Sequence, residues 1–195
     1  FALARRRLGD ERPAAAFAVL YLLNPSLHGI NVRDFHAAAL AIPLLLAALA
    51  FAEARRFWLL GGALLLTLAC REDAALPVGG VGAWLAVRHG YWLGGAALSL
   101  GALATLAVLL QWVIPSYRHE PYSHLWRYTA HGQSLGEIVG TLLLQPVRTV
   151  QYLMSGRRLV YLAALGAPLA FLPLRAPIDL VGAAPALLQN LLSSD

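Results

Sequence analysis

The stretch FWLLGGALLLTLACREDAALPVGGVGAWLAV, residues 57–87, decides the fold class, because three charges interrupt two long apolar runs. An ionisable side chain at membrane depth costs at least ~2.5–3.5 kcal/mol on insertion scales. Such a residue therefore marks a functional site, or a buried pair that lines a wet cavity. We take Arg71, Glu72 and Asp73, the charged triplet, as the first candidate site.

The composition of the 195-residue chain is that of a polytopic membrane protein. Hydrophobic residues make up 59% and charged residues 13% of the chain, and the mean hydropathy is +0.63. In a soluble globular domain about a quarter of the residues are charged. The formal net charge is +5, but the arginines are scattered between apolar runs and form no basic face. We expect the lipid bilayer as the partner and no nucleic acid.

Six apolar segments predict an all-α bundle of about six membrane helices in a single integral-membrane domain, residues 1–195. The segments are approximately residues 13–23, 37–52, 57–70, 74–87, 91–114 and 159–174. Several are short: a run of 14 residues rises about 21 Å, which is less than the ~30 Å of the hydrocarbon core. Either the bilayer thins locally, or the outer ends of these helices open into a protein-lined aqueous pocket, which is the arrangement we expect.

The arginines predict which loops face the cytoplasm. If the chain begins inside, eight arginines lie on the inner side and two lie in the short outer turns. The inner ones are Arg5, Arg6, Arg7, Arg12, Arg55, Arg56, Arg88 and Arg175, and the outer ones are Arg33 and Arg71. Residues 24–36, the charged triplet and the long segment 115–158 then face outward, although that long segment carries five more arginines.

The second half of the outer segment has an amphipathic helical pattern. Apolar residues recur with helical spacing through residues 134–155, and Pro146 should kink the helix. We expect this helix to lie along the outer membrane surface. The alternative is a seventh crossing, which would invert the orientation of everything after it.

Acids and histidines are segregated by this topology. The outer side collects Asp34, His36, Glu72, Asp73, His119, Glu120, His124, His131 and Glu137. Carboxylates and imidazoles that converge from separate loops suit general-base chemistry or a divalent cation, which is the candidate cofactor. The inner acids Asp10, Glu11 and Glu53 lie beside arginines, as surface charges at helix ends usually do.

Each member of the candidate donor or metal site also has a simpler interpretation. Asp34 could cap the helix that follows it, and His36 could serve only as an interfacial hydrogen-bonding group. Arg71 offers a planar fork that suits a phosphate or a carboxylate, while Glu72 and Asp73 project in different directions. The alternative at the triplet is an internal ion pair between Arg71 and one acid that fixes helix packing.

A second candidate site lies in the outer segment, at His119, Glu120 and Tyr122. The mixture of charge and aromatic rings there suits the binding of sugar rings. The alternative is a belt of aromatic anchors at the membrane interface. The belt would comprise Tyr117, Tyr122, Trp126 and Tyr128.

Four short runs resemble a family of prokaryotic predicted membrane proteins, a domain of unknown function that looks related to the GT-C glycosyltransferases. The runs are residues 24–29 (NPSLHG), 34–36 (DFH), 71–76 (REDAAL) and 187–193 (LLQNLLS). Ala37 stands where proline is common in that pattern, and Arg71 stands where lysine is common.

The resemblance implies a polytopic enzyme that takes a sugar from a polyprenyl-phosphate carrier on the outer side of the cytoplasmic membrane. GT-C enzymes place their leading catalytic acid in the first outer loop, ahead of the residues present here, so we expect this chain to be an internal fragment without that acid. Asp34, His36, Arg71, Glu72 and Asp73 would then form a supporting part of the donor or metal site.

Three functions follow from these observations. The first is a part of a GT-C-like glycosyltransferase with a lipid-linked sugar donor as its partner. The second is a transporter or flippase in which the charged triplet lines the substrate path, in agreement with the glycines and prolines that interrupt its helices. The third is a noncatalytic membrane scaffold whose buried ion pairs position helices.

Overall fold

The structure of the protein is a computed structural model that describes residues 1–23, 37–119 and 123–194. Within these residues the regular elements are helices and no strand occurs, which confirms the all-α prediction. The chain divides into two compact units, Phe1–Ala74 and Ala75–Asp195, and each is described by itself.

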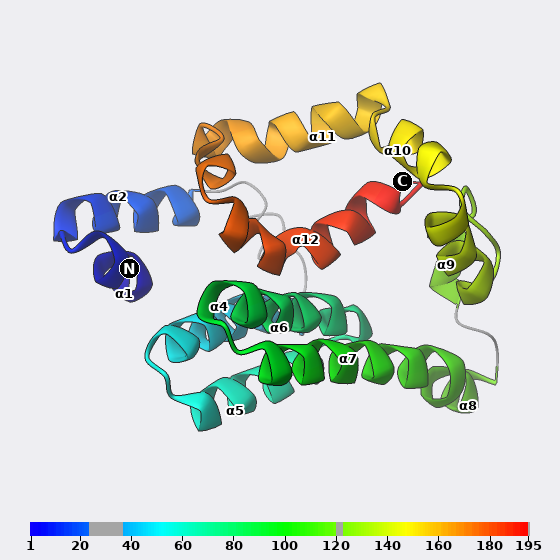
Figure 1. Ribbon diagram of the computed structural model, residues 1–195, viewed down its shortest axis with the longest axis horizontal. Coiled ribbons are helices and arrows are strands. Elements are labelled where there is room, and N and C mark those ends of the chain that lie inside the picture. The colour runs from blue at the N-terminus through cyan, green and yellow to red at the C-terminus, as the bar shows by residue number, and fades with distance from the viewer. Residues whose placement is uncertain (24–36, 120–122, 195) are drawn as a thin grey trace. The chain divides into compact units, whose positions relative to one another are not determined.

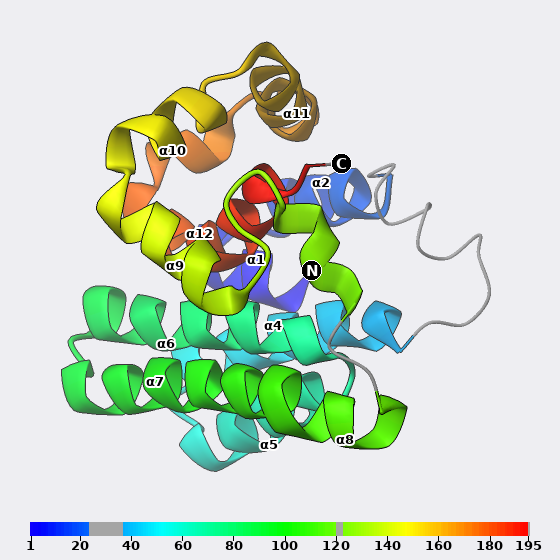
Figure 2. The same ribbon diagram turned by 90° about the vertical axis from the view of Figure 1, so that its right-hand side faces the viewer.

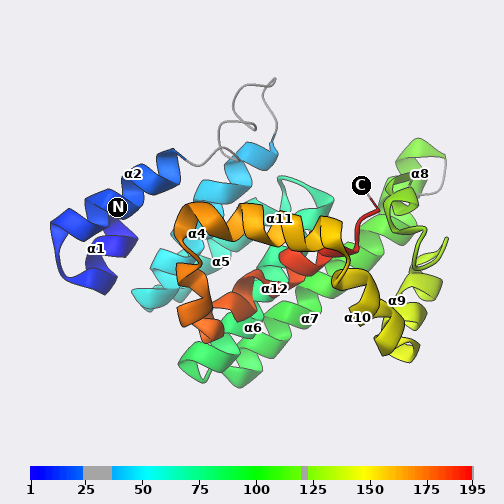
Figure 3. The ribbon, with the colours of Figure 1, turned by 90° about the horizontal axis from the view of Figure 1, so that it is seen from above.

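The first unit begins with a short helical hairpin of α1 (Ala2–Leu8) and α2 (Glu11–Leu22) (Figure 3). Gly9 makes the turn with a φ of 69°, a left-handed conformation that glycine adopts without steric penalty. The Asp10 side chain then caps α2 by accepting a hydrogen bond of 2.9 Å from the Arg12 backbone N–H.

Two apolar helices, α4 (Ala38–Glu53) and α5 (Phe57–Leu68), pack against each other and complete the first unit. Their tight connection passes through Arg55, which has a φ of 54°. The inner face of α5 is buried at Leu60 and Leu64. These helices fall within the predicted apolar segments 37–52 and 57–70, extending one residue beyond at Glu53.

The second unit is built on three helices, α6 (Ala75–His89), α7 (Trp92–Val108) and α12 (Pro177–Leu192), which lie side by side (Figures 1 and 2). α6 is the central one, since it packs on both of the others. Its buried residues include Val78 and Trp84. The six predicted segments omit α12, although it forms one side of this core.

Glycines let the three backbones approach closely. A Cβ on Gly82 would lie 2.6 Å from the carbonyl oxygen of Gly95 on α7, and a Cβ on Gly80 would collide with the carbonyl of Gly182 on α12. Ser99 on α7 adds a hydrogen bond of 2.8 Å from its hydroxyl to the Gly79 carbonyl. Small residues at helix contacts are typical of membrane helix packing.

α7 continues without interruption through a π-helical turn, Leu109–Val113, into α8 (Ile114–Arg118). The π-turn directly precedes Pro115, which has no N–H and whose ring crowds the carbonyl four residues earlier. In the described part of the chain, the combined helix Trp92–Arg118 alone is long and apolar enough to cross a membrane by itself. The other apolar helices, Ala39–Glu53, Phe57–Leu68 and Leu135–Leu144, are shorter.

The predicted amphipathic helix is two helices, α9 (Leu135–Leu144) and α10 (Pro146–Leu153). Gln145, the residue before the proline, has φ −123° and ψ 57°, because the proline ring disfavours helical backbone at that position. The expected kink is therefore a break.

The last predicted membrane segment, residues 159–174, is also not one continuous helix. α11 (Gly156–Gly166) is followed by two short 3-10 turns, Ala167–Leu169 and Leu172–Arg175. Each turn contains a proline near its start, Pro168 and Pro173, and neither proline can donate the hydrogen bond that would continue the helix.

Candidate functional site

The charged triplet lies directly after α5, at the end of the first unit. α5 ends at Leu68, and Glu72 opens a 3-10 turn, Glu72–Ala74. Arg71 Nη2 donates a hydrogen bond of 2.7 Å to Asp73 Oδ2. The Arg71 and Asp73 side chains are 47% and 30% exposed, so the pair stays in contact with solvent.

This hydrogen bond forms the internal ion pair that the sequence allowed at the triplet as the alternative to a ligand-binding site. It uses one nitrogen of the Arg71 guanidinium, and the Arg71 side chain makes no other hydrogen bond or ion pair within the described residues. The remaining N–H groups of the planar fork are therefore available to a second acceptor such as a phosphate or a carboxylate.

Most of the other predicted site residues lie outside the residues that the structure describes, namely Asp34, His36, Glu120 and Tyr122. His119 is described. It ends α8 in a left-handed conformation with a φ of 55°, its side chain is exposed, and it belongs to the second unit. The structure thus brings together Arg71 and Asp73 among the predicted set.

The aromatic residues around His119 that are described are partly exposed. Tyr117 is 82% exposed and Trp126 is 54% exposed, whereas Tyr128 is half-buried. Large exposed aromatic side chains are what an interfacial belt would present to a bilayer.

The acids that the sequence places beside arginines make contacts at helix ends, as predicted. Glu11 pairs with Arg5 at 3.1 Å, and Glu53 pairs with Arg7. Asp10 caps α2. These carboxylates are therefore occupied as helix-end surface charges and are poor candidates for chemistry.

A buried polar cluster around His131 was not predicted as a site. The His131 side chain is 4% exposed, and its ring meets the Tyr152 ring edge to face with centroids 4.5 Å apart. Within the described residues neither ring nitrogen has a hydrogen-bond partner. Burial, together with the positive charges of Arg148 and Arg158, lowers the pKa of His131 from its ordinary value of 6.5.

Arg158 connects this cluster to the end of α12. Its guanidinium lies over the Tyr152 ring, 3.5 Å from the centroid. Arg158 Nε donates to the Leu191 carbonyl at 2.7 Å, and Nη2 donates to the Ser193 carbonyl at 3.0 Å. An arginine thus satisfies carbonyl groups that the helix end leaves without an internal partner.

A second unpredicted cluster lies at the opposite end of α12. Trp84 Nε1 donates a hydrogen bond of 2.9 Å to Asp179 Oδ1, and Arg88 Nε lies 3.9 Å from the same oxygen. The Trp84 ring also meets His89 edge to face at 4.8 Å. The reasoning that selected the charged triplet could have found Asp179, because it is a single acid within the apolar run 177–188.

A metal centre is not visible in the described ranges, where no three His, Cys, Asp or Glu side chains gather closely enough to hold an ion. Asp34 and His36, two members of the predicted donor or metal site, lie outside these ranges. The divalent cation stays a prediction.

The chain matches a known protein family. A family model described as predicted membrane protein, DUF2079, covers residues 1–195, the whole chain. No curated protein matches the chain. No solved structure matches it either.

Proposed function

Because the chain belongs to the DUF2079 family of predicted membrane proteins, we propose that it is part of a GT-C-like integral membrane glycosyltransferase. The reaction is the transfer of a sugar from a polyprenyl-phosphate carrier at the extracytoplasmic face of the prokaryotic cytoplasmic membrane. An outer recess holds the lipid-linked donor, and an acid activates the acceptor hydroxyl by accepting its proton.

One observation carries this proposal: the arrangement of Arg71. Its guanidinium is fixed by one hydrogen bond to Asp73, is half exposed, and lies directly beyond the apolar helix α5. A positioned arginine with free N–H groups at such a place suits the phosphate of a lipid-linked donor, because the planar fork binds phosphate oxygens in pairs.

The proposed topology is the six-segment arrangement with the charged triplet outside, extended by α12. The packing within the second unit supports this extension. The contacts of α6 with α12 pair Gly80 with Gly182 and Trp84 with Asp179, so the two helices are antiparallel. Sixteen residues of helix rise about 24 Å, and α12 therefore connects the Arg88 end of α6 with the outer segment around Arg158.

The scaffold alternative is favoured by the same ion pair, but its energy argues against it. A solvent-exposed pair such as this one contributes only about 0.2–1 kcal/mol to stability. Stabilisation by the pair is too small to explain why three consecutive charges stand between two apolar helices.

The test is a transfer assay on the full-length protein with polyprenyl-phosphate-sugar donors. We expect Asp34→Ala, Glu72→Ala or Asp73→Ala to lower transfer, by roughly 10²–10⁴ for the acid that accepts the proton. Arg71→Gln should weaken the use of the donor and raise its KM.

The matched control is Glu11→Ala, which removes an acid that pairs with Arg5 at a helix end. Its transfer rate should equal that of the unsubstituted protein. Undiminished transfer in all three outer-acid variants would remove the proposed site.

A further inference from the structure

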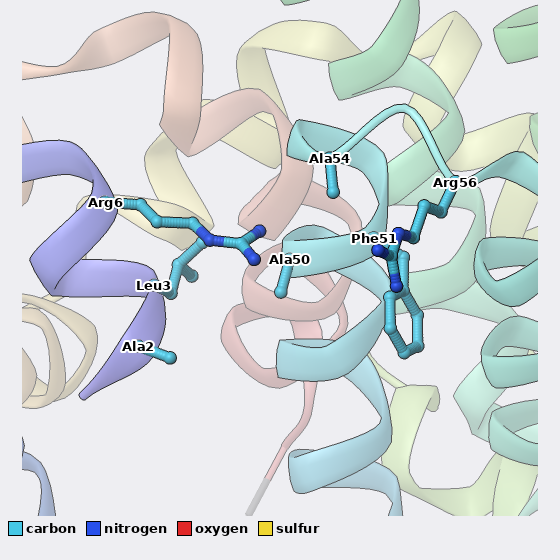
Figure 4. A pocket seen from close by; sticks show the side chains of 7 residues that line it. All are labelled: Ala2, Leu3, Arg6, Ala50, Phe51, Ala54 and Arg56. Carbon is cyan, nitrogen blue, oxygen red and sulfur yellow. The ribbon is translucent and has the colours of Figure 1, made fainter.

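The first unit contains a pocket between α1 and α4 that two arginines line. Its volume is about 110 Å³. Apart from Arg6 and Arg56 its wall is apolar, formed by Ala2, Leu3, Ala50, Phe51 and Ala54. In Figure 4 the Arg6 side chain extends from α1 toward Ala50, and the Arg56 side chain runs back beside Phe51. We call this the Arg6/Arg56 pocket.

The acids near this pocket are already engaged. Glu11 pairs with Arg5 at 3.1 Å, Glu53 pairs with Arg7, and Asp10 accepts the hydrogen bond of the α2 cap. Arg6 lies between the two paired arginines in sequence. The neighbouring carboxylates thus neutralise the arginines on either side of Arg6.

Neither arginine of the pocket has a partner for its guanidinium within the described residues, where their side chains make no hydrogen bond or ion pair. Both side chains are exposed, so a ligand can reach them from outside. Two cations beside an apolar wall suit a ligand with an anionic group and an adjoining apolar part.

We propose that the Arg6/Arg56 pocket binds the phosphate group of an anionic phospholipid. The volume of the pocket, about 110 Å³, is smaller than the ~150 Å³ cavity that accommodates benzene, so the pocket suits a group as small as a phosphate. The arginine-rich ends of a membrane protein face the leaflet that carries anionic lipids, and basic pockets between helices bind their head groups. The apolar wall favours a lipid over a free phosphate ion, because it can contact the apolar part of the lipid. This inference does not depend on sugar transfer.

The experiment is a titration of the full chain with phosphatidylglycerol, followed by native mass spectrometry. We expect the variant Arg6→Gln/Arg56→Gln to bind the lipid ~30-fold more weakly. This is the affinity that two arginines contribute near an anionic lipid surface. A second variant, Ala50→Leu, keeps every charge but fills the pocket, and it should lose the lipid as well. Circular dichroism and gel filtration verify that both variants are folded.

The matched control is Arg12→Gln/Arg55→Gln, which removes two charges from the same unit without touching the wall of the pocket. It should bind phosphatidylglycerol like the unsubstituted chain. If the control weakens lipid binding as much as Arg6→Gln/Arg56→Gln does, the effect comes from the net positive charge of the chain, and the proposal is wrong. Full binding by Ala50→Leu would also overturn it, as would displacement of the lipid by inorganic phosphate, which would identify a site for a free anion.

Discussion

At the scale of single residues, charged and polar groups of this chain fall into two classes. The first class pairs with close sequence neighbours, as Arg71 does with Asp73 at 2.7 Å and Asp10 does with the Arg12 backbone. The second class meets partners that are remote in sequence, as Trp84 does with Asp179. His131 is an exception to both classes, because its imidazole is buried without any hydrogen-bond partner among the described residues.

The burial of His131 predicts that the stability of the protein depends on pH. Its lowered pKa means that the folded state keeps the ring neutral while the unfolded chain still binds a proton. The stability that the neutral ring contributes is therefore fully present above the ordinary pKa of 6.5, and this contribution is lost as the pH falls below it. His131→Phe preserves the aromatic contact with Tyr152 and should abolish this part of the slope.

The measurement is thermal unfolding in detergent between pH 8 and pH 5, a window chosen around the pKa of histidine. His119→Phe is the control, because His119 is exposed and should leave the slope unchanged. If the slope of the His131→Phe protein equals that of the unsubstituted protein, the buried neutral imidazole is not its cause.

At the scale of the elements, glycines and prolines decide how the helices meet and where they end. Pro146 keeps Gln145 out of a helical conformation, so α9 ends at Leu144 and α10 begins at Pro146. Within α6, the glycines remove the side chains that would hold the neighbouring backbones apart. Close backbone approach thus adds to the packing of buried side chains such as Val78 and Trp84 in the core of the second unit.

Gly82→Ala should therefore destabilise the second unit. The new Cβ would lie 2.6 Å from the Gly95 carbonyl oxygen and 2.8 Å from the Ser99 backbone nitrogen, and neither backbone atom can move aside easily. We expect a loss of about 1–3 kcal/mol, which is typical of overpacking. The measurement is the midpoint of thermal or denaturant unfolding in detergent.

Gly94→Ala is the matched control for this prediction. A Cβ at Gly94 meets nothing within 4 Å, and alanine favours a helix by about 1 kcal/mol over glycine. This variant should be as stable as the unsubstituted protein or more stable. Equal destabilisation by the two substitutions would show that the contact at Gly82 is not what limits packing.

At the scale of the whole molecule, α12 joins two polar clusters of the second unit. Its first turn holds Asp179 against Trp84, and its last carbonyls accept hydrogen bonds from Arg158. The two clusters thus mark opposite ends of one helix. In the proposed topology, the Asp179 end faces the cytoplasm and the Arg158 end faces outward.

Labelling with a membrane-impermeant maleimide tests this topology in a Cys70→Ala background, since Cys70 is the sole cysteine. In intact cells Ser194→Cys and Asp73→Cys should react from outside, whereas Arg175→Cys should react only after the membrane is permeabilised. Reaction of positions 175 and 194 from the same side would contradict a crossing by α12. Access to position 73 from both sides would favour the transporter.

The sequence by itself determined the membrane class, the all-helical fold and much of the placement of α4 to α7, because hydropathy and chain breakers act locally. It also identified Asp10, Glu11 and Glu53 as charges at helix ends: Asp10 caps α2 and Glu11 pairs with nearby Arg5, whereas the partner of Glu53, Arg7, is 46 residues away and was decided by the tertiary structure. Local sequence equally shows why Arg71 and Asp73 can pair, since a single residue, Glu72, stands between them at a helix end. Whether the pair forms, and with which acid, was left to the structure.

Only the tertiary structure decided which distant groups meet. Asp179 reaches Trp84 across 95 residues of sequence because α6 and α12 pack antiparallel in one register. That register depends on the close approach of Gly80 and Gly182, where no side chain keeps the backbones apart. The burial of His131 and the Arg6/Arg56 pocket were likewise decided by the tertiary structure. Both arise where separate elements pack together, and such packing gives no periodic pattern in the sequence.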